Sequence, residues 1–467
     1  MRTLDGFSVS DLDQACGRVQ PALAALDGAS LFLTGGTGFF GRWLLALLVH
    51  ARAEKLFQCD VTVLSRAPEK FRAEHPDFAD LPWLRFCEGD VGCFEFPKGR
   101  FTHVIHAATD TSAEADRNPR RLVGSIVDGT RRVLDFAEMT GVKRLLYVSS
   151  GAVYGAQPGD LEKIPEDYAG ACDPLDPRTA YGQAKRLAEN SCAVAARDGL
   201  QTVIARAFAF VGPGLPLDGH FAIGNFIADA LAGREILVKG DGTPLRSYLY
   251  AADLAAWLIR LLVEGESGAA YNVGSDAAIS LGDLAHLVAR RLGAPGVKMA
   301  QSPGAGGLRS RYIPAIDKAR RDLGLDVWTG LEEAVARTAA YAREQETTRR
   351  PAPVHRNEHG GGKQLTFVVD VDGVVASLTP SNDYNLCTPL TGTIEIVNRL
   401  HDQGHRIVMF TARGSATGLD WLQATRDQFA RWGLKYHELR FGKPAGDYYI
   451  DDRLISLGEM RALSERT

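Results

Sequence analysis

Two groups of residues in this chain have the types and spacing of reactive centres. In the first group, Tyr181 and Lys185 lie four positions apart near the start of an expected helix, so their side chains share one helix face. A neighbouring ammonium favours the ionised form of a phenol, which lets a tyrosine exchange protons near neutral pH. Ser149 and Ser150 end an earlier apolar strand, where a hydroxyl can hold the reacting oxygen. This group predicts an acid/base centre in which Tyr181 exchanges a proton near neutral pH.

The second group is built from carboxylates. Asp370 and Asp372 lie two positions apart at the end of an apolar strand. The first can attack phosphorus, and the second can act as acid for the leaving group and then as base for water. Later polar residues complete the group: Thr411, Asp451 and Asp452 follow apolar strands, and Lys443 lies in a loop. Thr411 and Lys443 can steady phosphoryl oxygens, and the carboxylates (Asp370, Asp372, Asp451 and Asp452) suit Mg²⁺. This group predicts magnesium-dependent phosphoryl chemistry.

A glycine-rich segment lies upstream of the first group. Gly35, Gly38 and Gly41 follow one another at three-residue spacing, between a short strand and a helix. Glycines there permit a tight turn, and they let the backbone approach a pyrophosphate at the helix N-terminus. A purely structural glycine turn is the alternative. The strand–turn–helix setting favours a dinucleotide site.

The next expected strand ends at Ser65 and Arg66, where an acidic residue would bind a ribose 2′-hydroxyl and favour NAD. A guanidinium suits phosphate, so these residues favour NADP over NAD. The alternative is that Arg66 is a solvated loop charge or stacks on adenine. Asp90 follows the third strand and is expected to reach the adenine amino group, or else to shape a turn.

Strand-like and helix-like stretches alternate along the chain and predict the α/β class. We expect a Rossmann-type doubly wound parallel sheet with a small substrate lobe over residues 30–346, preceded by a helical extension over residues 1–29. Residues 347–364 contain two prolines and three consecutive glycines, which is typical of a linker. Residues 365–467 then repeat the alternation, and a second, smaller α/β domain is expected there.

Composition narrows the class of protein. The 467 residues include 53 Lys and Arg against 57 Asp and Glu, a net charge of −4, which argues against a basic nucleic-acid binder or a polybasic membrane-surface protein. The seven cysteines are odd in number and scattered, so reduced thiols in a cytoplasmic protein are expected. The longest apolar stretch, residues 39–49, contains Gly41 and is too short to span a bilayer.

Residues ~30–345 resemble the extended short-chain dehydrogenase/reductase family, specifically its nucleotide-sugar epimerases, dehydratases and reductases. The resemblance implies a nucleotide-sugar substrate, hydride transfer at a sugar carbon, and a homodimer. It makes Ser150 the catalytic hydroxyl beside Tyr181 and Lys185. The cofactor contacts that it implies are Gly35, Gly38, Phe39, Phe40, Gly41, Ser65, Arg66, Asp90, Val91, Ala107, Ala108, Thr109 and Lys185. The substrate contacts that it implies are Ser150, Arg246, Asn225 and either Arg309 or Arg311.

One departure from that family bears on the reaction. Its 4,6-dehydratases carry an Asp-Glu pair directly after the catalytic hydroxyl residue, and its uronate decarboxylases usually carry a Glu there. This chain has Gly151 and Ala152 instead. The departure favours 4-epimerisation or 4-keto-reduction, with NAD or NADP left open, over dehydration or decarboxylation with an atypical site. A non-catalytic dinucleotide sensor is a further alternative, although such sensors generally lack the Tyr/Lys pair.

Residues ~364–467 resemble the haloacid-dehalogenase (HAD) phosphatase superfamily. The resemblance makes Asp370 the nucleophile, Asp372 the acid/base, and Thr411 and Lys443 the phosphate-binding residues. Asp451, Asp452 or both would then hold Mg²⁺ together with Asp370 and Asp372. The implied substrate is a phosphorylated sugar or a related monoester, and a catalytically silent copy is the alternative. Taken together, the sequence predicts a bifunctional enzyme of nucleotide-sugar metabolism.

Overall fold

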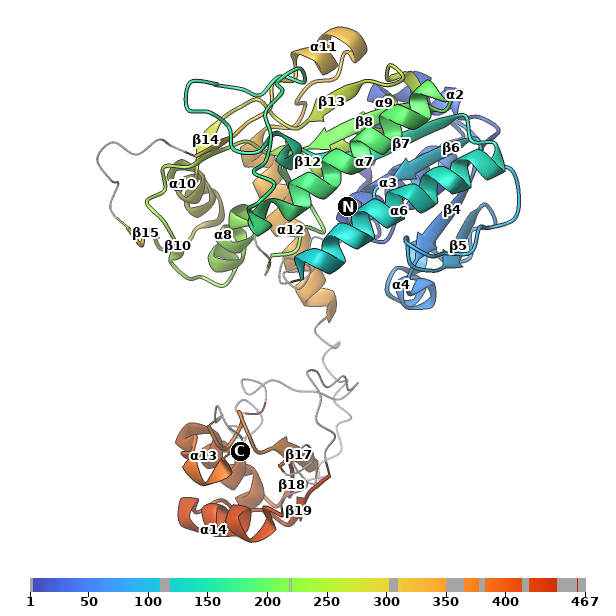
Figure 1. Cartoon of the computed structure of the whole chain (residues 1–467). Coiled ribbons are helices and arrows are strands. Elements are labelled where there is room, and N and C mark those ends of the chain that lie inside the picture. Colours follow the sequence, from blue (N-terminus) through green and yellow to red (C-terminus); the bar gives the residue numbers. More distant parts are fainter. Residues whose placement is uncertain are drawn as a thin grey trace. The chain divides into compact units, whose positions relative to one another are not determined.

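The computed structural model describes residues 3–109, 118–217, 219, 221–301, 310–349, 365–377, 383–413, 420–442 and 460 (Figure 1). The chain divides into two compact units, Met1–Ala352 and Pro353–Thr467. The first unit carries the tyrosine, lysine and glycine motifs, and the second carries the paired aspartates.

A seven-stranded parallel sheet forms the centre of the first unit. Its strands, in spatial order, are β13 (Ala270–Val273), β8 (Gln201–Ala207), β7 (Arg144–Ser150), β6 (His103–His106), β3 (Ala29–Thr34), β4 (Cys59–Ser65) and β5 (Leu84–Glu88). The order reverses at β3, which pairs with both β4 and β6. A reversal of this kind opens a crevice at the carboxyl ends of the strands, where doubly wound sheets bind their ligands. The predicted doubly wound parallel sheet is therefore confirmed.

Both faces of the sheet are covered by helices. Strand β3 shows why, because its side chains are buried on both faces. Leu31 and Leu33 point into one hydrophobic cluster, whereas Phe32 points into another. Successive residues of a strand face opposite sides, so an unbroken apolar strand is buried on both. The first cluster contains residues of α3 (Phe39–Ala53) and α9 (Ala251–Glu264). The second contains residues of α6 (Pro119–Thr140) and α7 (Ala180–Arg197).

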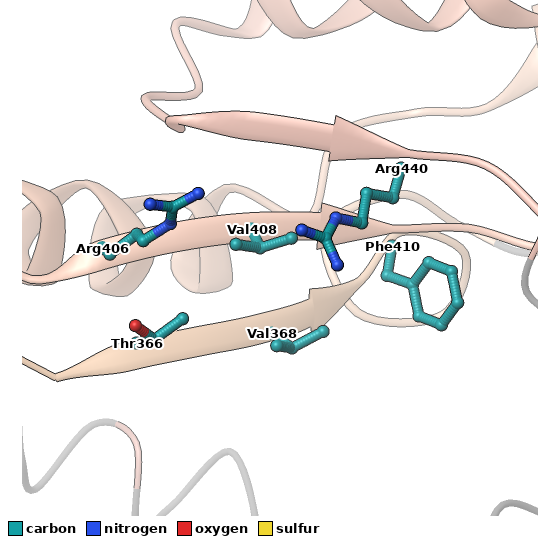
Figure 2. A pocket seen from close by; sticks show the side chains of 6 residues that line it. All are labelled: Thr366, Val368, Arg406, Val408, Phe410 and Arg440. Atoms are coloured by element: carbon teal, nitrogen blue, oxygen red, sulfur yellow. The ribbon is translucent and has the colours of Figure 1, made fainter.

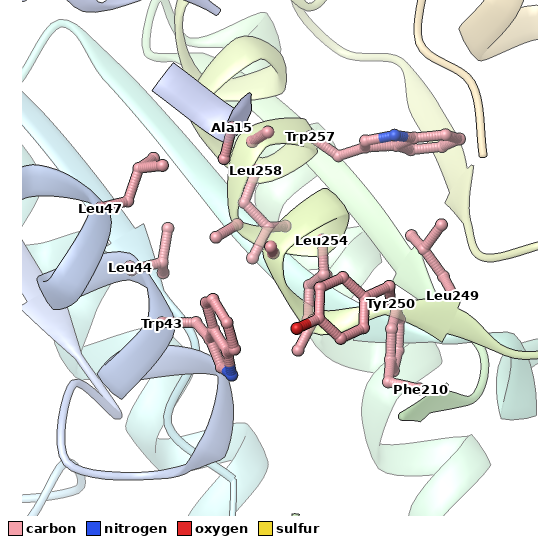
Figure 3. Packing of buried hydrophobic residues seen from close by; sticks show 14 of the residues in the cluster. Ala15, Trp43, Leu44, Leu47, Phe210, Leu249, Tyr250, Leu254, Trp257 and Leu258 are labelled. Carbon is pink, nitrogen blue, oxygen red and sulfur yellow. The ribbon is translucent and has the colours of Figure 1, made fainter. Parts of the chain in front are cut away.

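The N-terminal segment is part of the first hydrophobic cluster. It forms β1 (Thr3–Leu4), β2 (Phe7–Ser8), α1 (Val9–Arg18) and α2 (Gln20–Ala25). Ala15 of α1 packs with Leu44 of α3 and Leu258 of α9 (Figure 3). The buried Asp11 carboxylate accepts a hydrogen bond of 2.5 Å from the Tyr250 hydroxyl. These contacts attach the segment to both helices on this face of the sheet.

The chain beyond Gly212 builds a lobe and then returns to the sheet. Strand β13 pairs with β8 and extends the sheet at its edge, a return that the irregular pattern of this stretch does not reveal. The elements outside the main sheet are β9 (Phe210–Val211), α8 (Ala222–Leu231), β10 (Ile236–Val238), β11 (Leu245–Arg246), β12 (Leu249–Tyr250), β14 (Ile279–Ser280), α10 (Leu281–Leu292), β15 (Val297–Met299), β16 (Arg311–Tyr312), α11 (Asp317–Leu323), α12 (Leu331–Arg349) and, between β4 and β5, α4 (Pro68–Glu74).

The second unit contains a three-stranded parallel sheet. Its elements are β17 (Thr366–Asp370), α13 (Thr391–Asp402), β18 (Arg406–Phe410), α14 (Leu422–Trp432) and β19 (Glu438–Arg440). Phe367 and Val369 of β17 pack with Ile394 and Val397 of α13. The strand expected at residues 448–450 lies outside the described residues. The α/β alternation that the sequence predicts is thus found in the described part of this unit.

All seven cysteines belong to the described residues, and each carries a free thiol. Among the helices that the structure describes, none combines the length and the apolar character that a bilayer crossing demands.

Candidate active site

The glycine-rich turn connects β3 to α3 at the point where the strand order reverses. Gly35 has a φ of +73°, and a Cβ atom there would lie 2.6 Å from the Ala107 carbonyl. A Cβ atom on Gly41 would lie 2.3 Å from the Gly35 carbonyl oxygen. Larger residues are excluded at both positions, and the bare backbone at the start of α3 can approach a pyrophosphate closely. Gly38 is the exposed N-cap residue of α3.

The two phenylalanines of the turn lie half-buried at the start of α3. The Phe40 ring packs edge-on against Phe210, with 4.8 Å between ring centroids. The Phe39 and Phe40 rings lie 5.8 Å apart. These side chains therefore pack against the protein, and a cofactor contact from them would come through the backbone.

The ends of β4 and β5 carry the residues predicted to distinguish NAD from NADP. Ser65 is buried, and its hydroxyl accepts a hydrogen bond of 3.2 Å from the Ala67 amide. Arg66 and Asp90 are exposed, and Asp90 accepts a hydrogen bond from the Gly92 amide. The turn that was the alternative for Asp90 is therefore present. Val91, the next residue, is half-buried beside α6.

Residues after β6 connect the glycine turn to the predicted catalytic lysine. The Ala108 amide donates a hydrogen bond to the Thr34 hydroxyl at the end of β3. Lys185 Nζ donates to the Thr109 hydroxyl and to the Val148 carbonyl, each at 2.8 Å. Lys185 therefore bridges the ends of β6 and β7, beside the crevice in which a dinucleotide would lie.

Lys185 is 2% exposed, and this burial lowers its pKa from 10.5 to about 7. Its Nζ atom lies 6.0 Å from the centre of the Tyr181 ring. When Lys185 is protonated, its positive charge at this distance favours the phenolate form of a tyrosine over the phenol. The four-residue spacing thus brings the two side chains together as predicted.

Ser150 lies at the end of β7, beside the first turn of α7 that carries Tyr181. Its hydroxyl accepts a hydrogen bond of 3.2 Å from the Ala152 amide. Tyr312, from β16 in the lobe, places its hydroxyl beside the next residue, where a Cβ atom on Gly151 would lie 2.6 Å from it. Nothing in the sequence around Tyr312 predicts this position.

A buried polar network supports the end of β7. The Ser149 hydroxyl donates a hydrogen bond of 2.5 Å to the Glu189 carboxylate. Arg206 on β8 forms an ion pair with the same carboxylate at 2.8 Å and donates to the Tyr154 hydroxyl at 2.8 Å. Glu189 lies four residues after Lys185 on the same face of α7. That spacing was the available sequence signal for Glu189, which the sequence analysis missed.

The predicted substrate residues in the lobe fall into three places. Arg246 pairs with Tyr312 in the register of β11 and β16, whereas Arg311 lies opposite Leu245. Because side chains alternate along a strand, Arg246 and Tyr312 share one face of this small sheet and Arg311 takes the other. Asn225 lies half-buried on α8. Arg309 lies outside the described residues.

In the second unit, Asp370 ends β17, and Thr411 directly follows β18 in the adjoining register position. The Thr411 hydroxyl lies 3.4 Å from an Asp372 carboxylate oxygen. Arg413, which the sequence analysis did not select, binds Asp372 through Nε at 3.0 Å and Nη2 at 2.7 Å. Its guanidinium is fully buried. The predicted acid/base is therefore held in a two-pronged ion pair.

The remaining predicted residues of the second unit, Lys443, Asp451 and Asp452, lie outside the described residues. Among the residues that are described, no group of three or more His, Cys, Asp or Glu side chains is arranged to hold a metal ion. One cavity of about 380 Å³ lies on the sheet face of this unit (Figure 2). Its lining consists of Thr366, Val368, Arg406, Val408, Phe410 and Arg440.

Comparison with known proteins establishes the family of the first unit. Residues 31–274 match the NAD dependent epimerase/dehydratase family. UDP-glucuronic acid decarboxylase 1 of Xenopus tropicalis is 32% identical over 332 residues, which cover 69% of this chain and 74% of that protein. UDP-glucuronic acid decarboxylase 3 of Arabidopsis thaliana is 32% identical, covering 65% of this chain and 86% of that protein. This chain belongs to the NAD dependent epimerase/dehydratase family.

Solved structures agree with this fold. UDP-glucose 4-epimerase from Thermotoga maritima, solved with UDP-glucose, aligns with a TM-score of 0.57 and 23% identity, covering 68% of this chain and 99% of that chain. MoeE5, solved with UDP-glucose and NAD, aligns with a TM-score of 0.55 and 25% identity, covering 68% and 99%. The glycine turn fits the dinucleotide of this family, because Gly35 and Gly41 leave its backbone bare at the start of α3.

Proposed function

We propose that the first unit oxidises and re-reduces C4 of a UDP-sugar and thereby catalyses 4-epimerisation. NAD, when bound, supplies the hydride acceptor and donor. The UDP-sugar substrate is supported by the relatives, which are named as UDP-sugar enzymes. The single observation that favours epimerisation is the Gly151-Ala152 pair directly after Ser150, where the resemblance expects acidic residues in dehydratases and decarboxylases.

We assign the following roles to residues of this chain. Tyr181 accepts the proton of the sugar 4-hydroxyl as hydride leaves C4, and it returns that proton when hydride comes back to the opposite face of the ring. Lys185, in its protonated form, stabilises the phenolate electrostatically, and Ser150 holds the oxygen on C4 through its hydroxyl. The reaction is redox-neutral overall, since the hydride and the proton both return to the sugar.

To test this proposal, the purified full chain and NAD are incubated with UDP-glucose, UDP-galactose or UDP-glucuronate in separate reactions. The products are identified by NMR. We expect 4-epimers that appear without net change in nicotinamide absorbance. Tyr181→Phe should slow turnover by about 100-fold or more, because it removes the general acid/base. Undiminished turnover by Tyr181→Phe, or the absence of a 4-epimer from all three sugars, would overturn the proposal.

Decarboxylation of UDP-glucuronate is the second candidate, because the curated relatives at 32% identity carry that name. It begins with the same oxidation at C4, which leaves a β-keto acid. That acid loses CO₂, C5 takes up a proton, and hydride returns to C4. In the incubation with UDP-glucuronate, a UDP-pentose and released CO₂ would favour this reaction, whereas UDP-galacturonate would favour epimerisation.

A 4-keto-reductase would consume one reduced cofactor in each turnover, whereas an epimerase would not. The identity of residue 66 bears on which cofactor, NAD or NADP, the chain binds. We propose that Arg66 discriminates between NAD and NADP, since it lies exposed at the end of β4, where a 2′-phosphate would be. Denaturing the purified protein and identifying the released nucleotide tests this. Bound NAD⁺ fits the epimerase, whereas a vacant protein that takes up NADPH fits the reductase.

We propose that the second unit hydrolyses a phosphate monoester with Mg²⁺. Support comes from the strand ends, where Asp370 and Thr411 adjoin and Thr411 lies near Asp372. Asp370→Asn should abolish magnesium-dependent phosphate release from sugar phosphates and leave epimerisation unchanged. Asp402→Asn, at the exposed end of α13, is the matched control. A wild-type chain that releases no phosphate would favour the silent copy.

We also propose a homodimer formed through α6 and α7. These helices pack on each other and leave large apolar side chains in solvent. Met139 on α6 is 76% exposed, and Leu187 and Val194 on α7 are 51% and 45% exposed. Covering such a patch in a dimer removes apolar surface from water. Light scattering of the purified chain measures the mass directly, and a monomer would overturn this proposal.

A further inference from the structure

The two faces of the sheet in the second unit differ. Phe367 and Val369 of β17 and Met409 of β18 point into the hydrophobic cluster that includes residues of α13 and α14. Because side chains alternate along a strand, Val368 belongs to the opposite face. It is 64% exposed, although parallel sheets usually bury both of their faces. The cavity of about 380 Å³ lies on this second face, where a ligand can reach its lining (Figure 2).

The strand register aligns this cavity with the predicted nucleophile. Asp370 pairs with Phe410, and Phe410 pairs in turn with Arg440. These three residues form one row across the carboxyl end of the sheet, and alternation from Val368 places Asp370 on the cavity face. Phe410 and Arg440 also line the cavity. A molecule whose phosphate group is at Asp370 can therefore extend over the cavity.

The charges around the cavity favour an anion. The Glu438 carboxylate accepts hydrogen bonds from Arg406 Nη2 at 2.9 Å and from Arg440 Nε at 2.5 Å. Within the described part of the chain, Glu438 is the only ion-pair partner of either arginine. One carboxylate thus faces two guanidiniums, each of which has five N–H donors. The donors that remain can bind a further carboxylate or phosphate.

We infer that this cavity binds the organic part of the substrate and that the second unit selects phosphate monoesters carrying a second anionic group. The inference rests on the phosphatase function proposed above and names its substrate class. The body of the substrate lies over Val408 and Phe410, and its second anion reaches Arg406 and Arg440. Neighbouring strands are about 4.8 Å apart, so the substrate spans roughly 10 Å across the sheet from Asp370 to Arg440. A hexose 1-phosphate with a carboxylate or phosphate at C6 carries its charges at opposite ends.

Phosphate release from three hexose 1-phosphates tests this selection. The purified full chain and Mg²⁺ are incubated with glucose 1-phosphate, glucuronic acid 1-phosphate or glucose 1,6-bisphosphate in separate reactions. We expect kcat/KM to be about tenfold higher for at least one of the two doubly anionic substrates than for glucose 1-phosphate, the equivalent of one hydrogen bond to a charged group. A preference for glucuronic acid 1-phosphate would identify the second anion as a carboxylate, and a preference for the bisphosphate would identify it as a phosphate.

Arg440→Gln should reduce this preference to within about twofold, because it removes the guanidinium that lies in the row of Asp370. The matched control is Arg431→Gln. Arg431 is exposed on α14, the helix that packs on the opposite face, so the preference should stay unchanged. Equal kcat/KM values for the three substrates would overturn the inference. A preference that survives in Arg440→Gln would overturn it too.

A binding measurement separates this inference from the proposed function, because it needs no turnover. In the Asp370→Asn background with Mg²⁺, calorimetric titration with the preferred doubly anionic ligand, or with both when no phosphate is released, should show Arg440→Gln raising Kd about tenfold. Binding of the same ligand to the first unit would be common to both chains. Weaker binding in Arg440→Gln together with a wild-type chain that releases no phosphate would refute the hydrolysis and support the cavity site. Equal Kd values in the two chains would overturn the inference, whatever reaction the unit catalyses.

Discussion

Lys185 should make the first unit more stable as the pH rises from 7 to about 10. Its pKa is about 7 in the folded protein against 10.5 in the unfolded chain, because folding buries the amine. Between these values the unfolded chain binds a proton that the folded protein does not. The free energy of unfolding then rises with pH, by up to about 1.4 kcal/mol per pH unit. Integrated from pH 7 to pH 9, this gives about 2 kcal/mol.

The assay is urea denaturation of the cofactor-free full chain at pH 7, 8 and 9, with the transition of the first unit followed in each case. Lys185→Met replaces the amine by an apolar side chain of similar length, so it removes the titrating group. Between pH 7 and pH 9, the free energy of unfolding of the first unit should rise by about 2 kcal/mol more in the wild-type chain than in Lys185→Met. Lys70→Met on α4 serves as the control, because that ammonium is 71% exposed and loses little hydration on folding.

The test compares how steeply the free energy of unfolding rises with pH in each protein. The absolute free energies are not compared, because each substitution can also change stability by an amount that does not depend on pH. If wild type and Lys185→Met change in parallel with pH, the amine is charged in the folded state and the burial argument fails. If Lys70→Met also removes the pH-dependent gain, the gain comes from the general charge of the chain and not from Lys185.

Two further predictions concern buried ion pairs. Glu189→Ala leaves the Arg206 guanidinium and the Ser149 hydroxyl without their shared partner, and the first unit should lose about 3–5 kcal/mol in urea denaturation. A loss below about 1 kcal/mol would mean that water replaces the carboxylate at little cost. Arg413→Leu leaves Asp372 without the guanidinium that holds both its oxygens, and the second unit should lose about 3 kcal/mol. An unchanged urea midpoint for the second unit would contradict the claim that this ion pair stabilises it.

Local patterns in the sequence were sufficient to predict the parallel sheet and part of the candidate active site. The apolar strands and the amphipathic helices between them predicted a parallel doubly wound sheet, and the structure has it. The four-residue spacing of Tyr181 and Lys185 placed both side chains on one face of α7. These features are short-range, because helix and strand periodicity fix which side chains are neighbours within one element.

Contacts between distant segments could not be predicted in this way. Tyr312 comes to lie beside Gly151 from a two-residue strand of the lobe, and no local pattern marks a strand so short. Strand β13 returns to the sheet after a long irregular stretch, and its place depends on pairing with β8. In the second unit, Arg413 binds Asp372 across 41 positions of the chain.

The sequence by itself determined the class of fold, the dinucleotide turn and the tyrosine–lysine pair, because each depends on residues within a few positions of one another. Only the tertiary structure decided what surrounds the serine. Lys185 loses its solvent, and Tyr312 takes the space beside Gly151, because helices and lobe pack against the carboxyl ends of β6 and β7. Burial and excluded volume are properties of that packing, and they are set by residues far apart in the chain.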